Sequence, residues 1–283
     1  MDPLYQGALW FLPSLILLII LSVLFFDEHK KIDLHSLKKS LWDSRGGLFL
    51  MFLVAFALQI ENLIQDLYEP GFRVTEWFYQ FEGVSHIVWL QQNLDHYLLI
   101  HASSIFYVLG LSFFLSMIPV FLILRRESNL LEEFSKALAV NYMFIIPGYL
   151  LFHLVVTSFY VEDVEPLLYM HPQYNAIIRV TNRQVNCMPS GHTSIPFTIS
   201  LFALYRVKAK RLATFGFIFT ALTVFVIIYL GVHWLLDIPA GIAVAIIAYW
   251  VASRGKLDFI FDRITGPFEK YSKKIIEKIK YTL

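Results

Sequence analysis

The sequence is poor in charged residues and nearly free of cysteine. Charged residues fill 16% of the 283 positions, whereas an average soluble domain has about 25%. The single cysteine, Cys187, excludes an intramolecular disulfide and a cysteine-rich metal cluster. A chain so poor in charge and so rich in apolar residues is neither a disordered protein nor a soluble nucleic-acid binder.

Apolar residues dominate the chain instead, at 57% with 26 Phe, and the mean hydropathy is +0.60. Seven stretches are long enough, or nearly long enough, to cross a bilayer core of about 30 Å as helices. We therefore predict an all-α, polytopic integral membrane bundle of about seven transmembrane helices. The stretches are 7–26, 47–65, 98–124, 137–160, 192–206, 212–230 and 234–252.

Basic residues are distributed unevenly between the loops. With the N-terminus outside, the inner segments hold 20 of the 23 Lys and Arg. Only Arg73, Arg179 and Arg183 remain outside. Because basic loops stay on the cytoplasmic side, this orientation is the one we expect. "Outside" means here only the face opposite the basic loops.

Three regions are expected within this one membrane domain. Residues 1–136 hold N-terminal helices and an outer interfacial segment, in which aromatic residues recur at helical spacing between Trp77 and Trp89. Residues 137–253 form a second membrane region, which the motifs described below predict to be the catalytic core. Residues 254–283 form a basic amphipathic tail on the inner leaflet, with Gly266-Pro267 as a break before its apolar stripe.

A first chemical motif opens the fifth apolar stretch, at Pro189-Ser190-Gly191-His192. Pro, Ser and Gly before an apolar run predict a helix N-terminus, where free backbone N–H groups and the helix dipole attract anions. His192 stands one residue further in and can give or take a proton. The motif taken alone is also explained by a turn and a helix cap.

A second motif, His233 with Asp237, precedes the last apolar stretch. Four residues of separation place both side chains on one face of a helix. A carboxylate bonded to one imidazole nitrogen fixes the tautomer and leaves the other nitrogen nucleophilic. A purely structural hydrogen bond is the alternative interpretation.

Geometry connects the two motifs. His192 and His233 are 41 residues apart (233 minus 192), which corresponds to roughly 60 Å of helix, or two crossings of the bilayer core. Both histidines therefore lie on the outer face, with Arg179 and Arg183 in the loop that leads there. Two histidines, an aspartate, two arginines and a helix N-terminus on one face are typical of a site that binds a phosphate ester. A zinc site that uses His192, His233 and Asp237 is possible by ligand type, but the anion-binding N-terminus favours phosphate.

Pro189-Ser190-Gly191-His192 followed by His233 and Asp237 resembles the type-2 phosphatidic acid phosphatase superfamily. This superfamily includes haloperoxidase-like enzymes and several lipid phosphotransferases. The match lies in residues 137–252. Upstream, Glu82-Gly83, Val88-Trp89-Leu90-Gln91 and Asn141-Tyr142 with Pro147 look like the aureobasidin-resistance branch, whose members include inositol phosphorylceramide synthases.

The resemblance implies a role for each residue of the two motifs. His233 would be the nucleophile that takes the phosphoryl group, Asp237 would orient it, and His192 would protonate the leaving oxygen. The backbone at Ser190 and Gly191, with the Ser190 hydroxyl, would hold phosphate oxygens. No metal or cofactor is implied.

The sequence also departs from the phosphatase pattern. It has no Lys-x6-Arg-Pro run, and Val226 and Ile227 stand where that pattern has Ser-Arg. Arg183 and Arg179 are the substitutes we expect from position, although Arg183 could instead bind lipid headgroups. The missing cations favour the transferase branch.

The expected function is phosphotransfer on a lipid substrate at the outer membrane face, with an alcohol as acceptor. An inositol-phosphorylceramide-synthase-like headgroup transferase is slightly favoured. A lipid phosphate phosphatase, of the phosphatidate or polyprenyl phosphate type, uses water as acceptor and is the alternative. A non-catalytic lipid-binding membrane protein is a more distant one. The expected partners are the lipid substrate, an alcohol and the bilayer, without nucleic acid.

Overall fold

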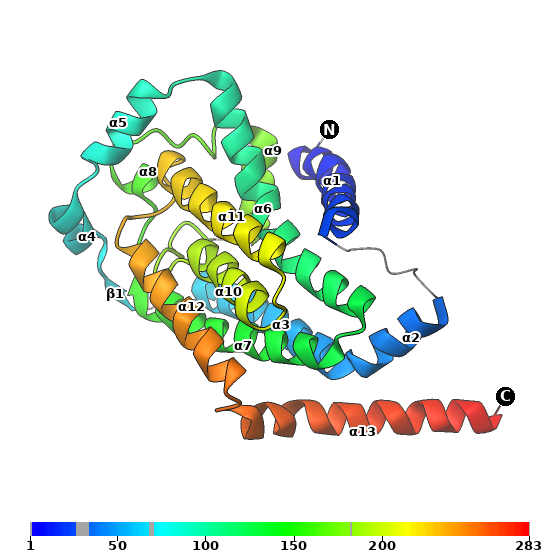
Figure 1. The fold of residues 1–283 in the computed structure, drawn as a ribbon. Helices are drawn as coiled ribbons and strands as arrows, with labels where there is room; N and C mark the ends of the chain where they lie inside the picture. Colours follow the sequence, from blue (N-terminus) through cyan, green and yellow to red (C-terminus); the bar gives the residue numbers. More distant parts are fainter. Residues whose placement is uncertain (1, 27–33, 68–70, 182, 283) are drawn as a thin grey trace.

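A computed structural model describes residues 2–26, 34–67, 71–181 and 183–282 (Figure 1). Helices make up most of this part, and two short strands pair in parallel between them. The elements are α1 (Pro3–Phe26), α2 (Leu34–Asp43), α3 (Arg45–Leu67), β1 (Phe72–Arg73), α4 (Thr75–Glu82), α5 (Ser85–Asn93), α6 (Tyr97–Arg125), α7 (Ser128–Leu151), β2 (Phe152–His153), α8 (Thr157–Tyr160), α9 (Pro172–Thr181), α10 (Gly191–Tyr205), α11 (Lys210–Tyr229), α12 (Asp237–Ser253) and α13 (Asp258–Thr282).

The seven predicted apolar stretches correspond to seven of these helices, and the all-α membrane fold is confirmed. Five described helices, α1, α3, α6, α7 and α11, are each long and apolar enough to span a membrane. A sixth span is counted when α12 is taken together with α13, which is bent from it by 69°. Helix α10 has 15 residues, fewer than the roughly 20 that a full crossing needs. The chain is an integral membrane protein.

Two boundaries differ from expectation. The stretch 137–160 is wrong at both ends, because α7 runs from Ser128 to Leu151 and the chain then pairs with β1. The run that follows contains Val155-Val156-Thr157, and β-branched side chains favour extended backbone. Because this run is also apolar, hydropathy alone predicted that the helix continues through it.

The break expected at Gly266-Pro267 is also wrong, since α13 continues through it. This helix is held from both sides of that point. Phe268 stacks on Phe49 of α3 with ring centroids 4.1 Å apart, and Lys136 of α7 pairs with Asp258. These contacts offset the hydrogen bond that the proline cannot make.

Helix α10 forms the centre of the bundle and packs against α6, α7, α11 and α12. Its core-facing side chains, such as Ile195, Ile199 and Phe202, are almost fully buried. Gly241 lets α12 approach the start of α10 closely, because a Cβ there would lie 2.7 Å from the Ser190 carbonyl oxygen. This contact sets the beginning of α12 against the Pro-Ser-Gly-His motif.

Helices α1 and α13 lie at the edges of the bundle (Figure 1). Helix α1 packs on α6 and α9, with the rings of Trp10 and Tyr174 centred 5.9 Å apart. Most of its apolar side chains are exposed, as lipid contact requires. Helix α13 lies across the end of the bundle where α3 begins.

The helix directions separate the basic turns from the two motifs. The turns at Arg125-Arg126 and at 206–211, and the start of α13, share one end of the bundle, while His192 and His233 lie at the other. Lys30 and Lys31, counted with the inner cations, lie outside the described residues. Which end faces the cytoplasm stays a prediction.

Candidate active site

His233 and Asp237 are in direct contact, but not through the continuous helix that their spacing predicted. Helix α11 ends at Tyr229, and His233 lies in the turn before α12, whose first residue is Asp237. Gly231 has a φ of +70° in this turn, a conformation that glycine adopts without strain. The turn folds the imidazole back over the start of α12.

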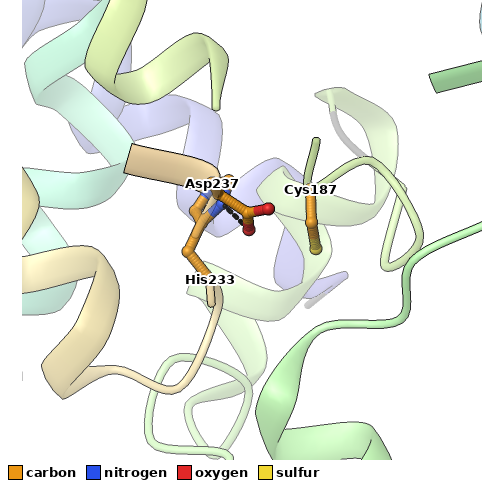
Figure 2. Close-up of side chains that lie close together, drawn as sticks. All are labelled: Cys187, His233 and Asp237. Atoms are coloured by element: carbon orange, nitrogen blue, oxygen red, sulfur yellow. Dashed lines mark hydrogen bonds and ion pairs between the residues drawn. The ribbon is translucent and has the colours of Figure 1, made fainter. Parts of the chain in front are cut away.

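The Asp237 carboxylate holds the His233 ring in one orientation (Figure 2). Its Oδ2 lies 3.1 Å from His233 Nδ1 and also accepts the backbone N–H of Trp234 at 3.0 Å. His233 is 1% exposed and Asp237 is 0% exposed. A buried carboxylate on Nδ1 keeps the proton there, so Nε2 carries the free lone pair and points away from Asp237.

His192 faces that free nitrogen. Its Nδ1 lies 3.5 Å from His233 Nε2, so the structure places the two histidines together as their separation predicted. The other side of the His192 ring stacks on Tyr107 of α6, with centroids 4.5 Å apart and planes at 24°. A group bound to His233 Nε2 would therefore have the His192 imidazole beside it.

Ser190 and Gly191 form the expected helix N-terminus. The Ser190 hydroxyl oxygen accepts the backbone N–H of Thr193 at 3.2 Å, as an N-cap does. Its backbone N–H donates to the Asp237 carbonyl at 3.3 Å, which ties the two motifs together. The Tyr149 hydroxyl of α7 lies against Gly191, 3.1 Å from where a Cβ would stand. The N-terminus of α10 therefore already has the Tyr149 hydroxyl oxygen beside it.

Glu82, at the end of α4, holds the other side of the histidine turn. Its Oε1 accepts the backbone N–H of Leu235 at 2.7 Å, and its Oε2 accepts that of Leu236 at 2.9 Å. Burial raises the pKa of the Glu82 carboxyl, and the two N–H donors oppose that rise. The sequence placed Glu82 in the outer interfacial segment and in the motif Glu82-Gly83, but it gave no sign of this contact.

The structure does not bring Arg179 and Arg183 to the histidines. Arg183 pairs with Asp66 of α3, and Arg179 donates to Asn175 Oδ1 at 3.0 Å. Both arginines line a cavity of about 380 Å³, while His192 lines another, and Ile178 lies in the wall of each. Their phosphate-binding role stays a prediction.

The Ser-Arg positions of the phosphatase pattern offer no charge either. Val226 and Ile227 are buried apolar side chains at the end of α11. An anion-attracting feature that remains beside His192 is the N-terminus of α10, through the positive end of its helix dipole.

Cys187 lies beside the His233–Asp237 pair, and ligand-type atoms of the three lie within 4.8 Å of one another (Figure 2). The set fits a metal poorly. Burial and the Asp237 charge raise the pKa of the Cys187 thiol well above its usual range, so the sulfur keeps its proton and donates to the Val232 carbonyl at 3.8 Å. Metals bind the thiolate, and Asp237 Oδ2 is engaged by His233.

An apolar cavity of about 240 Å³ has His192 in its wall. Apolar side chains from α1, α3, α6 and α10 form most of its wall, among them Phe11, Leu58, Val108 and Ile195. Tyr107, Tyr142 and Tyr149 add hydroxyl groups. Apolar walls beside a reactive group suit a ligand whose body is a hydrocarbon chain.

Fold and site together define an integral membrane protein of phosphatase or phosphotransferase type. Residues 77–251 match the PAP2 superfamily, which is the type-2 phosphatidic acid phosphatase group that the motifs resemble. The match covers more than half of the chain, so the chain belongs to this superfamily. Comparisons with curated proteins and with solved structures gave no match.

Proposed function

We propose that the chain is a lipid phosphotransferase that works through a phosphohistidine on His233. In the first half-reaction, His233 Nε2 attacks phosphorus, the bond from phosphorus to the leaving oxygen breaks, and His192 gives that oxygen a proton. In the second, the acceptor oxygen attacks phosphorus, its proton passes to His192, and the phosphorus–nitrogen bond breaks. Asp237 supports the charge on His233 in both.

The observation that carries the proposal is the alignment of Asp237, His233 and His192 at the N-terminus of α10. Separations of 3.1 Å and 3.5 Å join the three side chains in one line. The N-terminus of α10 lies at His192, and the positive end of its helix dipole suits a phosphate group. Each part of the two half-reactions thus has a matching group.

An alcohol is the acceptor that we favour over water. His233 and Asp237 are buried, and exclusion of water slows hydrolysis of a reactive intermediate. The absence of cations at positions 226 and 227 separates the site from the phosphatase pattern. The reaction would then be an inositol-phosphorylceramide-synthase-like headgroup transfer, with a metal required in neither half.

The test incubates detergent-purified protein with lipids that carry phosphate or phosphodiester headgroups, in EDTA, with and without candidate alcohols. We expect a new lipid by mass spectrometry only when an alcohol is present, and none from His233→Ala. His101→Ala is the matched control, because His101 contacts Tyr174 rather than the site. A tenth of the activity left in His233→Ala would exclude the nucleophile.

The same assay separates the alternatives. Phosphate release without any alcohol would make the protein a lipid phosphatase. No turnover across the panel would favour a lipid-binding protein without catalysis. A label from the phosphate group that stays on denatured protein at alkaline pH and is lost in acid would identify the phosphohistidine directly.

A further inference from the structure

A polar cluster lies inside the membrane region on α3, outside the part of the chain that matches the superfamily. Glu61, Asn62 and Gln65 lie on the last two turns of this spanning helix, and Glu61 is only 1% exposed. An ionisable side chain inside a span is costly and is retained for function or pairing.

The cluster has hydrogen-bond acceptors left over. Gln65 Nε2 donates to Asn186 Oδ1 at 2.7 Å and to the Tyr149 carbonyl at 3.2 Å, and Asn186 Nδ2 approaches Glu61 Oε1 at 3.5 Å. Among the described residues, Glu61 Oε2, Asn62 Oδ1 and Gln65 Oε1 are buried without a partner. Every one of these atoms is an oxygen, so the cluster lacks donors. Unpaired buried acceptors each cost about 1–3 kcal/mol.

Asn186 connects the cluster to the candidate active site. It directly precedes Cys187, whose sulfur lies beside the His233–Asp237 pair. Leu58, one turn before Glu61 on α3, lines the same cavity as His192.

Tyr149 makes a second connection. Its carbonyl accepts from Gln65, while its hydroxyl lies against Gly191 at the start of α10. The Glu61 carboxyl is also near enough to act electrostatically on that hydroxyl. Tyr149, which lines the same cavity as His192, thus contacts both the cluster and the candidate active site.

The charges nearby decide which donor fits. Arg183 already acts on Glu61 electrostatically and pairs with Asp66 one turn further along α3. A metal ion or an ammonium group would add positive charge beside this arginine, whereas a hydroxyl donates without adding charge. The apolar walls of the adjoining cavity suit the body of an alcohol.

We propose that Glu61, Gln65 and Asn186 bind a hydroxyl group of the acceptor alcohol and so determine which alcohol is used. The inference rests on the proposed phosphotransfer. The hydroxyl comes either from a soluble polyol or from a hydroxylated lipid whose chain occupies the cavity, and the two sources are separate arms of the test. Glu61 acts here by binding and takes no part in bond making.

The test compares Glu61→Gln and Gln65→Leu with Gln59→Leu, which places the same leucine on the exposed face of α3. Transfer is measured against myo-inositol and glycerol in one arm, and against diacylglycerol and ceramide in the other. We expect the KM for one arm to rise about tenfold in both cluster variants, with slow hydrolysis of the donor lipid unchanged. Gln59→Leu should match the wild type.

An unchanged KM in both arms would overturn the site, and so would a parallel fall in hydrolysis and transfer, which indicates a structural role. Thermal unfolding of the His233→Ala protein with each alcohol gives a readout without turnover. Thermal stabilisation by an alcohol that disappears when Glu61→Gln is added would support the binding site. If the wild type also transfers nothing, only the proposed function fails. Turnover with no effect of either cluster variant leaves the proposed function intact and removes this site.

Discussion

Glu82→Gln is the substitution that tests most directly how the histidine turn is held. The Glu82 carboxylate accepts two backbone N–H groups, those of Leu235 and Leu236, next to the turn that carries His233. A glutamine amide keeps one acceptor oxygen and turns an NH2 group toward the second N–H. One hydrogen bond to a charged group is therefore lost at a half-buried site.

The size of the effect follows from that one bond. Hydrogen bonds to charged groups contribute roughly 1.5–3 kcal/mol, and partial exposure of Glu82 favours the lower end. About 1.4 kcal/mol corresponds to a tenfold change in rate. We therefore expect kcat/KM to fall about tenfold in Glu82→Gln and about a hundredfold in Glu82→Ala, which loses both bonds.

The assay is steady-state turnover of the lipid substrate, with thermal unfolding measured in parallel. Glu76→Gln is the matched control, because Glu76 lies on the same helix and, within the described residues, bonds to the side chains of Gln80 and Tyr160 rather than to the histidine turn. An unchanged kcat/KM in Glu82→Gln would refute the reasoning. An equal loss in Glu76→Gln would assign the effect to α4 as a whole.

The pH profile gives a second measure of the same contact. Burial, with a further contribution from the Asp237 charge, raises the pKa of Glu82 above its ordinary value. Only the carboxylate accepts both N–H groups, so activity is full above this raised pKa and falls as the pH drops through it. The fall should therefore begin above the usual glutamate range near about 4.3. Glu82→Gln should lose this component of the profile, and a profile identical to that of the wild type would contradict it.

Two further substitutions test the site and its packing. Asp237→Asn removes the charge that supports His233 and should lower kcat about tenfold to a hundredfold with little change in KM; steady-state kinetics that show an altered KM alone would contradict this. Gly241→Ala places a Cβ 2.7 Å from the Ser190 carbonyl oxygen and should lower stability by about 1–3 kcal/mol. A thermal unfolding temperature equal to that of the wild type would count against the close approach of α12 and α10.

Hydropathy and short-range patterns predicted much of the fold. The seven apolar stretches correspond to helices in the structure because a spanning segment must be both long and apolar. The proximity of His192 and His233 followed from counting two crossings of the membrane. Both arguments use properties that lie along the chain and need no knowledge of packing.

The remaining features depend on contacts between distant segments. Glu82 reaches a backbone N–H 153 residues away, and nothing in its local sequence indicates that partner. Arg183 was expected to bind phosphate because of its position in a loop, but in the structure it pairs with Asp66 of α3. The contact between His233 and Asp237 was expected from helical spacing, but a turn makes it instead.

The order of the site residues along the chain has a consequence for biosynthesis. Glu82 and the Pro-Ser-Gly-His motif are translated before His233, and Asp237 opens the last helix of the central bundle. A nascent chain halted after α11 therefore carries His192 but neither His233 nor Asp237. Asp237 and Gly241 contact Ser190 from α12, so the two motifs come together only after this helix has packed. Under the proposed mechanism, a half-inserted chain cannot form the phosphohistidine.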